Sequence, residues 1–176
     1  MLALTDENVQ TIAELTNTND LLAIKPVVLR LYSELESRGA LLPREKQANL
    51  ASLVYIAARK KGLPILLEDL EYVFGVNRKR IFRFLKRNIR ALRIHLPPED
   101  PLPFLDRYAK EFNLTPKEYR KVKSLLLKIP LSGKSVKAMV ISTIVYVKNL
   151  DAIKIAKEYR VSPYTIKIYR DLLKSL

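Results

Sequence analysis

The amino-acid sequence predicts an all-α protein built from two tandem five-helix repeats, each ending in a helix-turn-helix. Long stretches are rich in Leu, Ile, Ala, Lys, Arg and Glu, which favour helix, and only four glycines interrupt the 176 residues. No stretch alternates apolar and polar residues for long enough to indicate a strand. The two halves also match each other, with the same order of expected helices in each.

We expect five helices in the first half. The third is apolar almost all round from Leu50 to Ala58, so it should be central and buried. Gly75 separates the last two, and Asn77 is a good N-cap for the second of them. A short helix, a turn that holds glycine and a longer basic helix form a helix-turn-helix. The first helix is expected over about residues 6–15, and the second runs to Ser37 with Pro26 in its first turn. The third follows Pro43 and has its core at residues 50–62, and the last two cover about 67–74 and 78–93.

A proline-rich linker, residues 96–103, is expected between the repeats. The stretch from His95 to Pro103, HLPPEDPLP, holds four prolines in nine residues, which is typical of a loop. The first repeat is then 1–95 and the second 104–176. The second also ends in a short helix, a turn and a longer helix, with Ser162 as cap and Pro163 at the first helical position. Its earlier helices are expected over about residues 104–112, 116–128 and 136–147.

The internal match predicts a duplication. At an offset of 85 residues, Ile81 aligns with Ile166 and Phe84 with Tyr169. Tyr55, in the first apolar helix, aligns with the tyrosine 91 residues later in the second. The second copy is therefore about six residues shorter between its central helix and its helix-turn-helix.

The net charge of +14 indicates a polyanionic partner. The charge is unevenly placed, at −3 over residues 1–40, +9 over 41–98 and +8 over 99–176. Such a surplus favours nucleic acid as the partner. The alternative is a generally basic surface with no bound partner.

Several classes of protein are not expected. The chain has no cysteine, which excludes disulfides, thiolate metal sites and thiol catalysis. Gly133-Lys134-Ser135 lacks the earlier glycine of a phosphate loop, and His95, the single histidine, has no metal partners. We therefore expect no enzyme, no cofactor and no metal. The start is too polar for a signal peptide, and the apolar stretches are too short to span a membrane, so we expect a soluble intracellular protein.

Two groups of motifs carry a family resemblance. The first group is VYIAAR (54–59), GLP (62–64), LED (67–69) and GVNRK (75–79); the second is SGKS (132–135), Val161-Ser162, Thr165-Ile166, Tyr169 and Leu172. In this order and spacing they resemble the two cyclin-like repeats of archaeal transcription factor B, the counterpart of eukaryotic transcription factor IIB. The resemblance covers roughly residues 12–176.

The resemblance implies a function. Members of this family bind the TATA-binding protein on bent promoter DNA, and the second-repeat helix-turn-helix reads an element upstream of the TATA box. The first repeat contacts the TATA-binding protein and backbone phosphates. A further contact with RNA polymerase or another transcription factor is possible within this family. We expect a monomer in the archaeal cytoplasm, associated with the nucleoid.

The chain also departs from the family pattern. Family members carry a zinc ribbon and a reader segment that engage RNA polymerase, and neither is recognisable here. This indicates either a core fragment or a regulatory paralogue that lacks the polymerase-recruiting arm. Val136 replaces a proline that is usual in the family, and the loop around residues 149–151 is shortened.

The predicted DNA-binding residues lie mainly on the last helix of each repeat. In the first, Lys79, Arg83, Lys86 and Arg90 share one helical face, opposite an apolar stripe that includes Ile81. In the second, residues near the helix start should reach base edges, while Ile166, Ile168 and Leu172 should pack. The alternatives are a solvated basic face and a helix that only packs and touches backbone. The full predicted set is Arg78, Lys79, Arg80, Arg83, Lys86, Arg87, Lys134, Ser162, Tyr164, Thr165, Lys167 and Arg170.

Two other functions stay open at this point. A cyclin-like adaptor would bind a kinase or another protein and never touch DNA, since fold does not fix function. A free-standing helix-turn-helix repressor would bind DNA without the TATA-binding protein, and the duplication would supply pseudo-symmetry within one chain.

Overall fold

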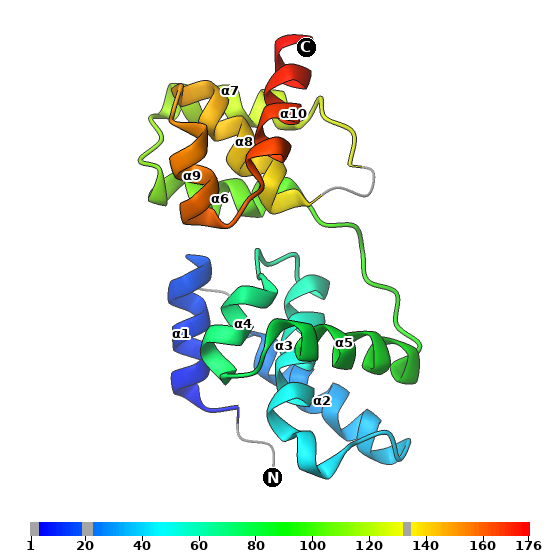
Figure 1. Ribbon diagram of the computed structural model, residues 1–176. Helices are drawn as coiled ribbons and strands as arrows, with labels where there is room; N and C mark the ends of the chain where they lie inside the picture. The colour runs from blue at the N-terminus through cyan, green and yellow to red at the C-terminus, as the bar shows by residue number, and fades with distance from the viewer. Residues whose placement is uncertain (1–3, 19–22, 132–134) are drawn as a thin grey trace. The chain divides into compact units, whose positions relative to one another are not determined.

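The computed structural model describes residues 4–18, 23–131 and 135–176 of the chain. In these ranges the regular secondary structure is helical, with ten α-helices and a 3-10 helix and no strand (Figure 1). The prediction of an all-α protein is thus confirmed. The helices gather into two compact units, Met1–Pro98 and Glu99–Leu176.

The first unit is organised around a buried helix, α3. Every residue of α3 from Ala48 to Ala58 is buried, and α2, α4 and α5 all pack against it, while α1 packs against α4. The expectation that this segment is central is therefore confirmed. The elements of this unit are α1 (Asp6–Thr16), α2 (Ile24–Ser37), the 3-10 helix η2 (Pro43–Glu45), α3 (Lys46–Lys60), α4 (Leu67–Phe74) and α5 (Arg78–Leu92).

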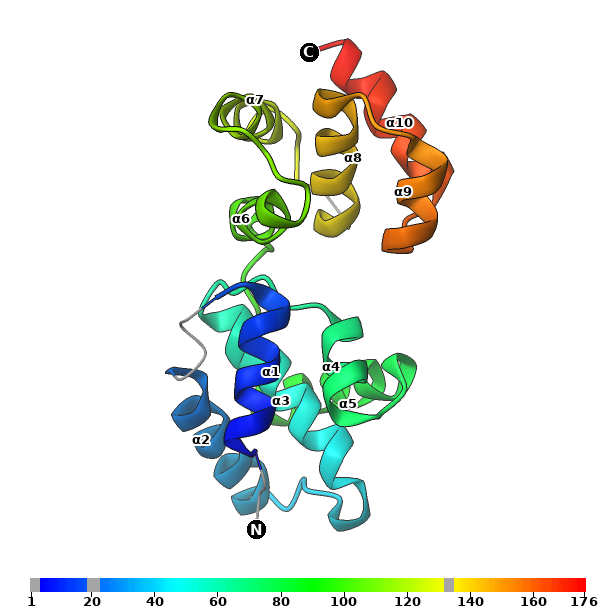
Figure 2. The ribbon, with the colours of Figure 1, turned by 90° about the vertical axis from the view of Figure 1, so that its left-hand side faces the viewer.

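The second unit is organised in the same manner around α8. Residues Val136 and Ala138–Val145 of this helix are buried, and α6, α7, α9 and α10 pack against it. Figure 2 shows α8 between the pair α6 and α7 and the pair α9 and α10. The helices are α6 (Pro101–Glu111), α7 (Pro116–Leu126), α8 (Val136–Lys148), α9 (Ala152–Tyr159) and α10 (Pro163–Lys174).

In both units the third helix is central and the fifth packs along it. This shared arrangement agrees with a duplication, which remains a prediction from the sequence.

One expected helix start was wrong, and the placement of a proline in the first turn of another helix is confirmed. Helix α6 begins at Pro101, inside the stretch 96–103 expected to be linker. The Asp100 carboxylate accepts a hydrogen bond from the Leu102 amide at 2.9 Å, and a proline at the first helical position loses no hydrogen bond. Helix α2 runs from Ile24 to Ser37, and Pro26 lies in its first turn, as predicted. A residue there has no helical acceptor for its amide, so proline costs no hydrogen bond.

A buried polar cluster joins α5 to α3 in the first unit. The Asn88 amide nitrogen donates to Ser52 Oγ at 2.7 Å and to Asn49 Oδ1 at 3.3 Å. All three side chains are almost fully buried. Because buried polar groups are stable only when paired, these bonds fix the rotation of α5 about its axis. The polar face of α5 is therefore turned outward in a defined way.

Candidate nucleic-acid interface

The first helix-turn-helix consists of α4 and α5 and a tight turn between them. Helix α4 ends at Gly75, whose backbone is left-handed with φ of 63°, a conformation that glycine adopts without steric cost. Asn77 caps α5, because its Oδ1 accepts from the Lys79 amide at 2.9 Å. The turn thus holds the amino-terminal end of α5 in a fixed position.

Helix α5 separates apolar from cationic side chains. Ile81, Leu85 and Leu92 are buried in the core of the first unit. Lys79, Arg83, Lys86 and Arg90 are exposed, and their spacing of three or four residues places them on one face. Among the described residues, none of these four cations takes part in an ion pair. Their charges are therefore available to a phosphate backbone.

The other three predicted cations of α5 have partners inside the first unit. Arg78 Nη1 lies 3.1 Å from Glu68 Oε1, and Arg80 forms an ion pair with Glu45. Arg87 is half-buried and donates from Nη2 to the Ala40 carbonyl oxygen at 2.6 Å.

The structure therefore does not bring Arg87 to the exposed face. Its role in this unit is to hold the segment between α2 and α3 against α5. No local pattern indicates these pairings, because the partners of Arg80 and Arg87 lie 35 and 47 residues earlier in the chain.

The second helix-turn-helix consists of α9 and α10. Asp151 caps α9, since its carboxylate accepts from the Ile153 and Lys154 amides at 2.9 and 3.2 Å. Helix α9 ends at Arg160, which has a left-handed backbone with φ of 53°. Ser162 occupies the N-cap position of α10, as predicted, but its hydroxyl makes no capping hydrogen bond within the described part of the chain.

Helix α10 presents a polar face that includes most of the predicted residues. Ile166, Tyr169 and Leu173 are buried, so the opposite face is open to solvent. Burial raises the pKa of the Tyr169 hydroxyl. The predicted residues on the open side are Ser162, Tyr164, Lys167 and Arg170, with Thr165 half-buried beside them.

Tyr164 is the most exposed aromatic side chain of this helix, at 72 %. Ile168 was expected to pack, but it is 42 % exposed. The buried positions 166, 169 and 173 follow the helical period, and residue 168 falls outside their stripe.

One predicted residue, Lys134, lies outside the described residues. The neighbouring Ser135 caps α8, with its Oγ accepting from the Ala138 amide at 3.3 Å.

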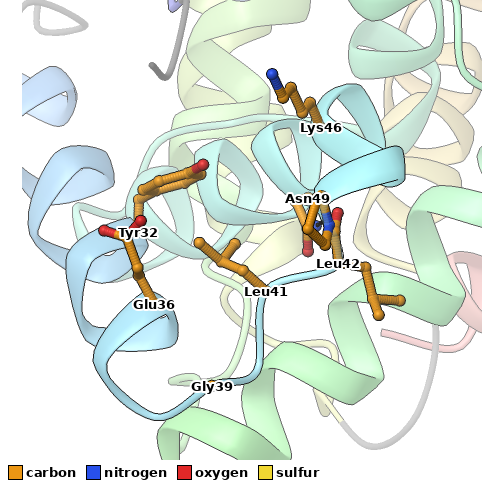
Figure 3. Close-up of a pocket in the computed structure, with 8 residues that line it drawn as sticks. Tyr32, Glu36, Gly39, Leu41, Leu42, Lys46 and Asn49 are labelled. Carbon is orange, nitrogen blue, oxygen red and sulfur yellow. Dashed lines mark hydrogen bonds between the residues drawn. The ribbon is translucent and has the colours of Figure 1, made fainter.

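The first unit also has a pocket of about 310 Å³ between α2 and α3 (Figure 3). Tyr32 and Glu36 come from α2, and Lys46 and Asn49 from α3. The floor is largely apolar, and Glu36 and Lys46 are the charged groups in its lining. Figure 3 shows Leu41 between the two helices. The remaining lining residues are Gly39, Leu42 and Pro43.

A metal-binding cluster and a membrane-spanning helix are both absent from the described part of the chain. The described ranges contain no group of three or more His, Cys, Asp or Glu side chains that could hold a metal ion. They also contain no helix that is long and apolar enough to cross a bilayer.

Fold and surface together define an all-helical protein with a helix-turn-helix at the end of each of two units. No protein-family model matches the sequence. Curated relatives do match it. Transcription initiation factor IIB of Pyrodictium occultum is 25 % identical over 105 residues, which is 60 % of this chain and 34 % of the relative.

Transcription initiation factor IIB 2 of Haloferax volcanii is 32 % identical over 87 residues, or 49 % of this chain and 26 % of the relative. Transcription initiation factor IIB 1 of Thermococcus kodakarensis is 27 % identical over 162 residues, or 84 % of this chain and 53 % of the relative. The matches span between about a quarter and a half of the relatives' length. The chain is therefore similar to archaeal transcription initiation factor IIB, which confirms the resemblance predicted from the motifs.

Proposed function

We propose that this chain is a transcription-factor-IIB-like DNA-binding protein that joins a TATA-binding protein already seated on promoter DNA. The observation that carries the proposal is a helix at the end of each unit that exposes cations with no ion pair among the described residues, in a chain similar to transcription initiation factor IIB. These cations are Lys79, Arg83, Lys86 and Arg90 on α5 and Lys167 and Arg170 on α10. The relatives are longer than this chain, so the proposal concerns promoter binding by this chain alone.

In this proposal α10 reads the sequence beside the TATA box. Recognition helices contact base edges with residues near their start, and Tyr164, Thr165 and Lys167 lie in the first two turns of α10. Arg170 is one turn further along on the exposed side. A guanidinium can donate two hydrogen bonds to guanine O6 and N7, so Arg170 supplies base discrimination, and Ser162 binds a backbone phosphate.

Helix α5 has a different task in the proposal. Four exposed cations of α5 that form no ion pair with a described residue, Lys79, Arg83, Lys86 and Arg90, neutralise backbone phosphates or an acidic surface of the TATA-binding protein. Because each neutralised phosphate releases counterions, this contribution weakens steeply with salt. Arg78 and Arg80 are available only when their carboxylate partners are displaced.

A footprinting experiment tests the proposal. The chain is added to a TATA-containing promoter fragment with and without an archaeal TATA-binding protein. The proposal predicts protection that extends beyond the TATA box only when both proteins are present. Protection by this chain alone, unchanged by the TATA-binding protein, would instead indicate a free-standing regulator.

The pocket between α2 and α3 favours a second candidate function, that of a protein adaptor. An apolar floor beside Glu36 fits an aliphatic side chain next to a basic residue of a partner protein. In that case Leu41→Lys would abolish binding to a protein partner and leave DNA binding unchanged. The cations of α5 and α10 have no role in this function, so it is the weaker candidate.

A further inference from the structure

We infer that the exposed face of α7 is a separate binding surface for the phosphate backbone of duplex DNA. This surface lies outside both helix-turn-helices, and we call it the α7 strip. It consists of four cationic residues of α7, Lys117, Arg120, Lys121 and Lys123, and of Lys128 in the turn directly after the helix.

All five side chains of the α7 strip are exposed. The opposite face of α7 is anchored, because Val122 and Leu126 are buried and the helix packs against α8. Thr115 caps the helix, accepting from the Glu118 amide at 3.2 Å, and the Glu118 carboxylate accepts from the Thr115 amide at 2.8 Å. The helix is thus rigidly held, and the cations project from a fixed base.

The α7 strip lacks countercharges within the described residues. The one acidic residue of α7 is Glu118, which is engaged by Thr115 and lies 3.6 Å from Lys148 Nζ. The nearby Asp106 accepts a hydrogen bond from the Tyr119 hydroxyl at 2.5 Å. No ion pair in the described ranges includes a member of the strip. Five like charges on about three turns repel one another, so a polyanion would relieve an existing cost.

The dimensions of the strip suit a nucleic-acid backbone. At a rise of about 1.5 Å per residue, the helical cations from Lys117 to Lys123 span roughly 9 Å along α7. Lys128 lies in the turn after the helix and extends the strip beyond that. Neighbouring cations three or four residues apart are about 5–6 Å from each other at Cβ. Duplex DNA carries one negative charge per about 1.7 Å of its axis, so several cations of the strip can each meet a phosphate.

The composition of the strip favours DNA over an acidic protein. Protein interfaces are anchored by aromatic or other large apolar side chains in a desolvated centre. No large apolar side chain is exposed between Lys117 and Lys123, and the exposed Leu127 stands at the end of the strip beside Lys128. Contacts made by lysine to phosphate carry no base information, so binding here is independent of sequence. The choice of DNA as the polyanion rests on the proposed function.

The test compares two triple variants of the full chain with the same net charge. The strip variant is Lys117→Gln, Lys121→Gln, Lys128→Gln. The control variant is Arg30→Gln, Lys60→Gln, Lys61→Gln, which are also exposed cations but lie in the first unit. Glutamine is a good helix former, and circular dichroism checks that both variants keep the helical content of the wild type.

Binding to a duplex of random sequence, without a TATA box or TATA-binding protein, is measured between about 50 and 200 mM salt. Each lost phosphate contact lowers the slope of log K against log salt by about 0.9. The three substitutions of the strip variant are expected to make this slope shallower by about 2.7, and those of the control by less than about 1. At the lower salt concentration the strip variant should bind at least about 10-fold more weakly than the control.

Equal slopes for the two variants would overturn the inference. An unchanged DNA slope for the strip variant, together with loss of its binding to poly-glutamate, would also overturn the inference. That result would assign the strip to an acidic protein. The outcome is separable from that of the proposed function. If the wild type fails to extend the TATA-box footprint while the strip variant still lowers the slope, only the proposed function fails.

Discussion

Arg80, at the start of α5, forms an ion pair with Glu45, which lies 35 residues earlier at the end of η2. The pair joins the segment that leads into the central helix to the second helix of the first helix-turn-helix. It also neutralises one of the cations predicted to bind DNA. If Arg80 contacts a DNA phosphate, the Glu45 carboxylate competes for its guanidinium.

Replacing Glu45 should strengthen DNA binding. Glu45→Gln frees Arg80 to contact a phosphate, so we expect about 2- to 5-fold tighter binding near 100 mM salt and a slope steeper by up to about 0.9. The stability cost should be below about 1 kcal/mol, because the Arg80 side chain is about half exposed and such pairs contribute little. Glu36→Gln, which removes an exposed acid of α2, is the matched control. Equal gains for both variants would mean that only net charge matters.

Removing Asn88 should destabilise the first unit. Asn88→Ala leaves Ser52 Oγ and Asn49 Oδ1 buried without their donor, which costs about 1–3 kcal/mol. Urea denaturation followed by circular dichroism measures the change. Asn8→Ala on the half-exposed side of α1 should cost less than about 0.5 kcal/mol. A loss as small for Asn88→Ala would show that the cluster does not fix α5.

The contact between Tyr119 and Asp106 should make stability fall at alkaline pH. The hydrogen bond to Asp106 raises the pKa of Tyr119 from 10.0 to about 12. The folded state thus holds the phenolic proton more tightly than the unfolded state. This contribution to stability is fully present below the unfolded pKa of 10.0 and is lost as the pH rises toward 12.

Tyr119→Phe is the variant that tests this pH dependence. The wild-type melting temperature should fall more steeply than that of Tyr119→Phe between about pH 10 and pH 12. Parallel curves for the two proteins would show that the contact is absent in solution. The absorbance of tyrosinate, compared between the two proteins, gives the pKa of this hydroxyl directly.

Arg170 should carry base discrimination. Arg170→Ala is expected to weaken the complex with the TATA-binding protein and promoter by about 1–3 kcal/mol and to relax the preference at one base position. Lys174→Ala, in the last turn of α10, should lower affinity slightly and equally for all sequences. Binding to a set of duplexes with single base-pair changes beside the TATA box distinguishes the two effects. A uniform loss for Arg170→Ala would assign it to phosphate only.

Periodicity made much of this fold predictable. The apolar run from Leu50 to Ala58 indicated a buried central helix, and the stripe that includes Ile81 and Leu85 indicated which face of α5 packs. These features are local, because hydrophobic burial at helical spacing is encoded within one segment.

Features that depend on other segments were not predictable in the same way. The pairings of Arg80 and Arg87 join residues far apart in the sequence, and no pattern along α5 distinguishes them from the unpaired Arg83. Ile168 was misassigned because apolar character was given more weight than its position relative to the buried stripe of α10. The start of α6 lies inside the expected linker because four prolines in nine residues are typical of a loop. In the structure Asp100 caps the helix, and proline suits its first position.

Joint binding of this chain and the TATA-binding protein to DNA is tested most directly by the coupling free energy between them. The measurement is the Kd of the chain for a labelled TATA-containing duplex, with and without saturating TATA-binding protein, by fluorescence anisotropy at fixed salt. If the chain joins the TATA-binding protein on DNA, we expect at least about 10-fold tighter binding when that protein is present, a coupling of about 1.4 kcal/mol or more. The same Kd in both conditions would contradict it.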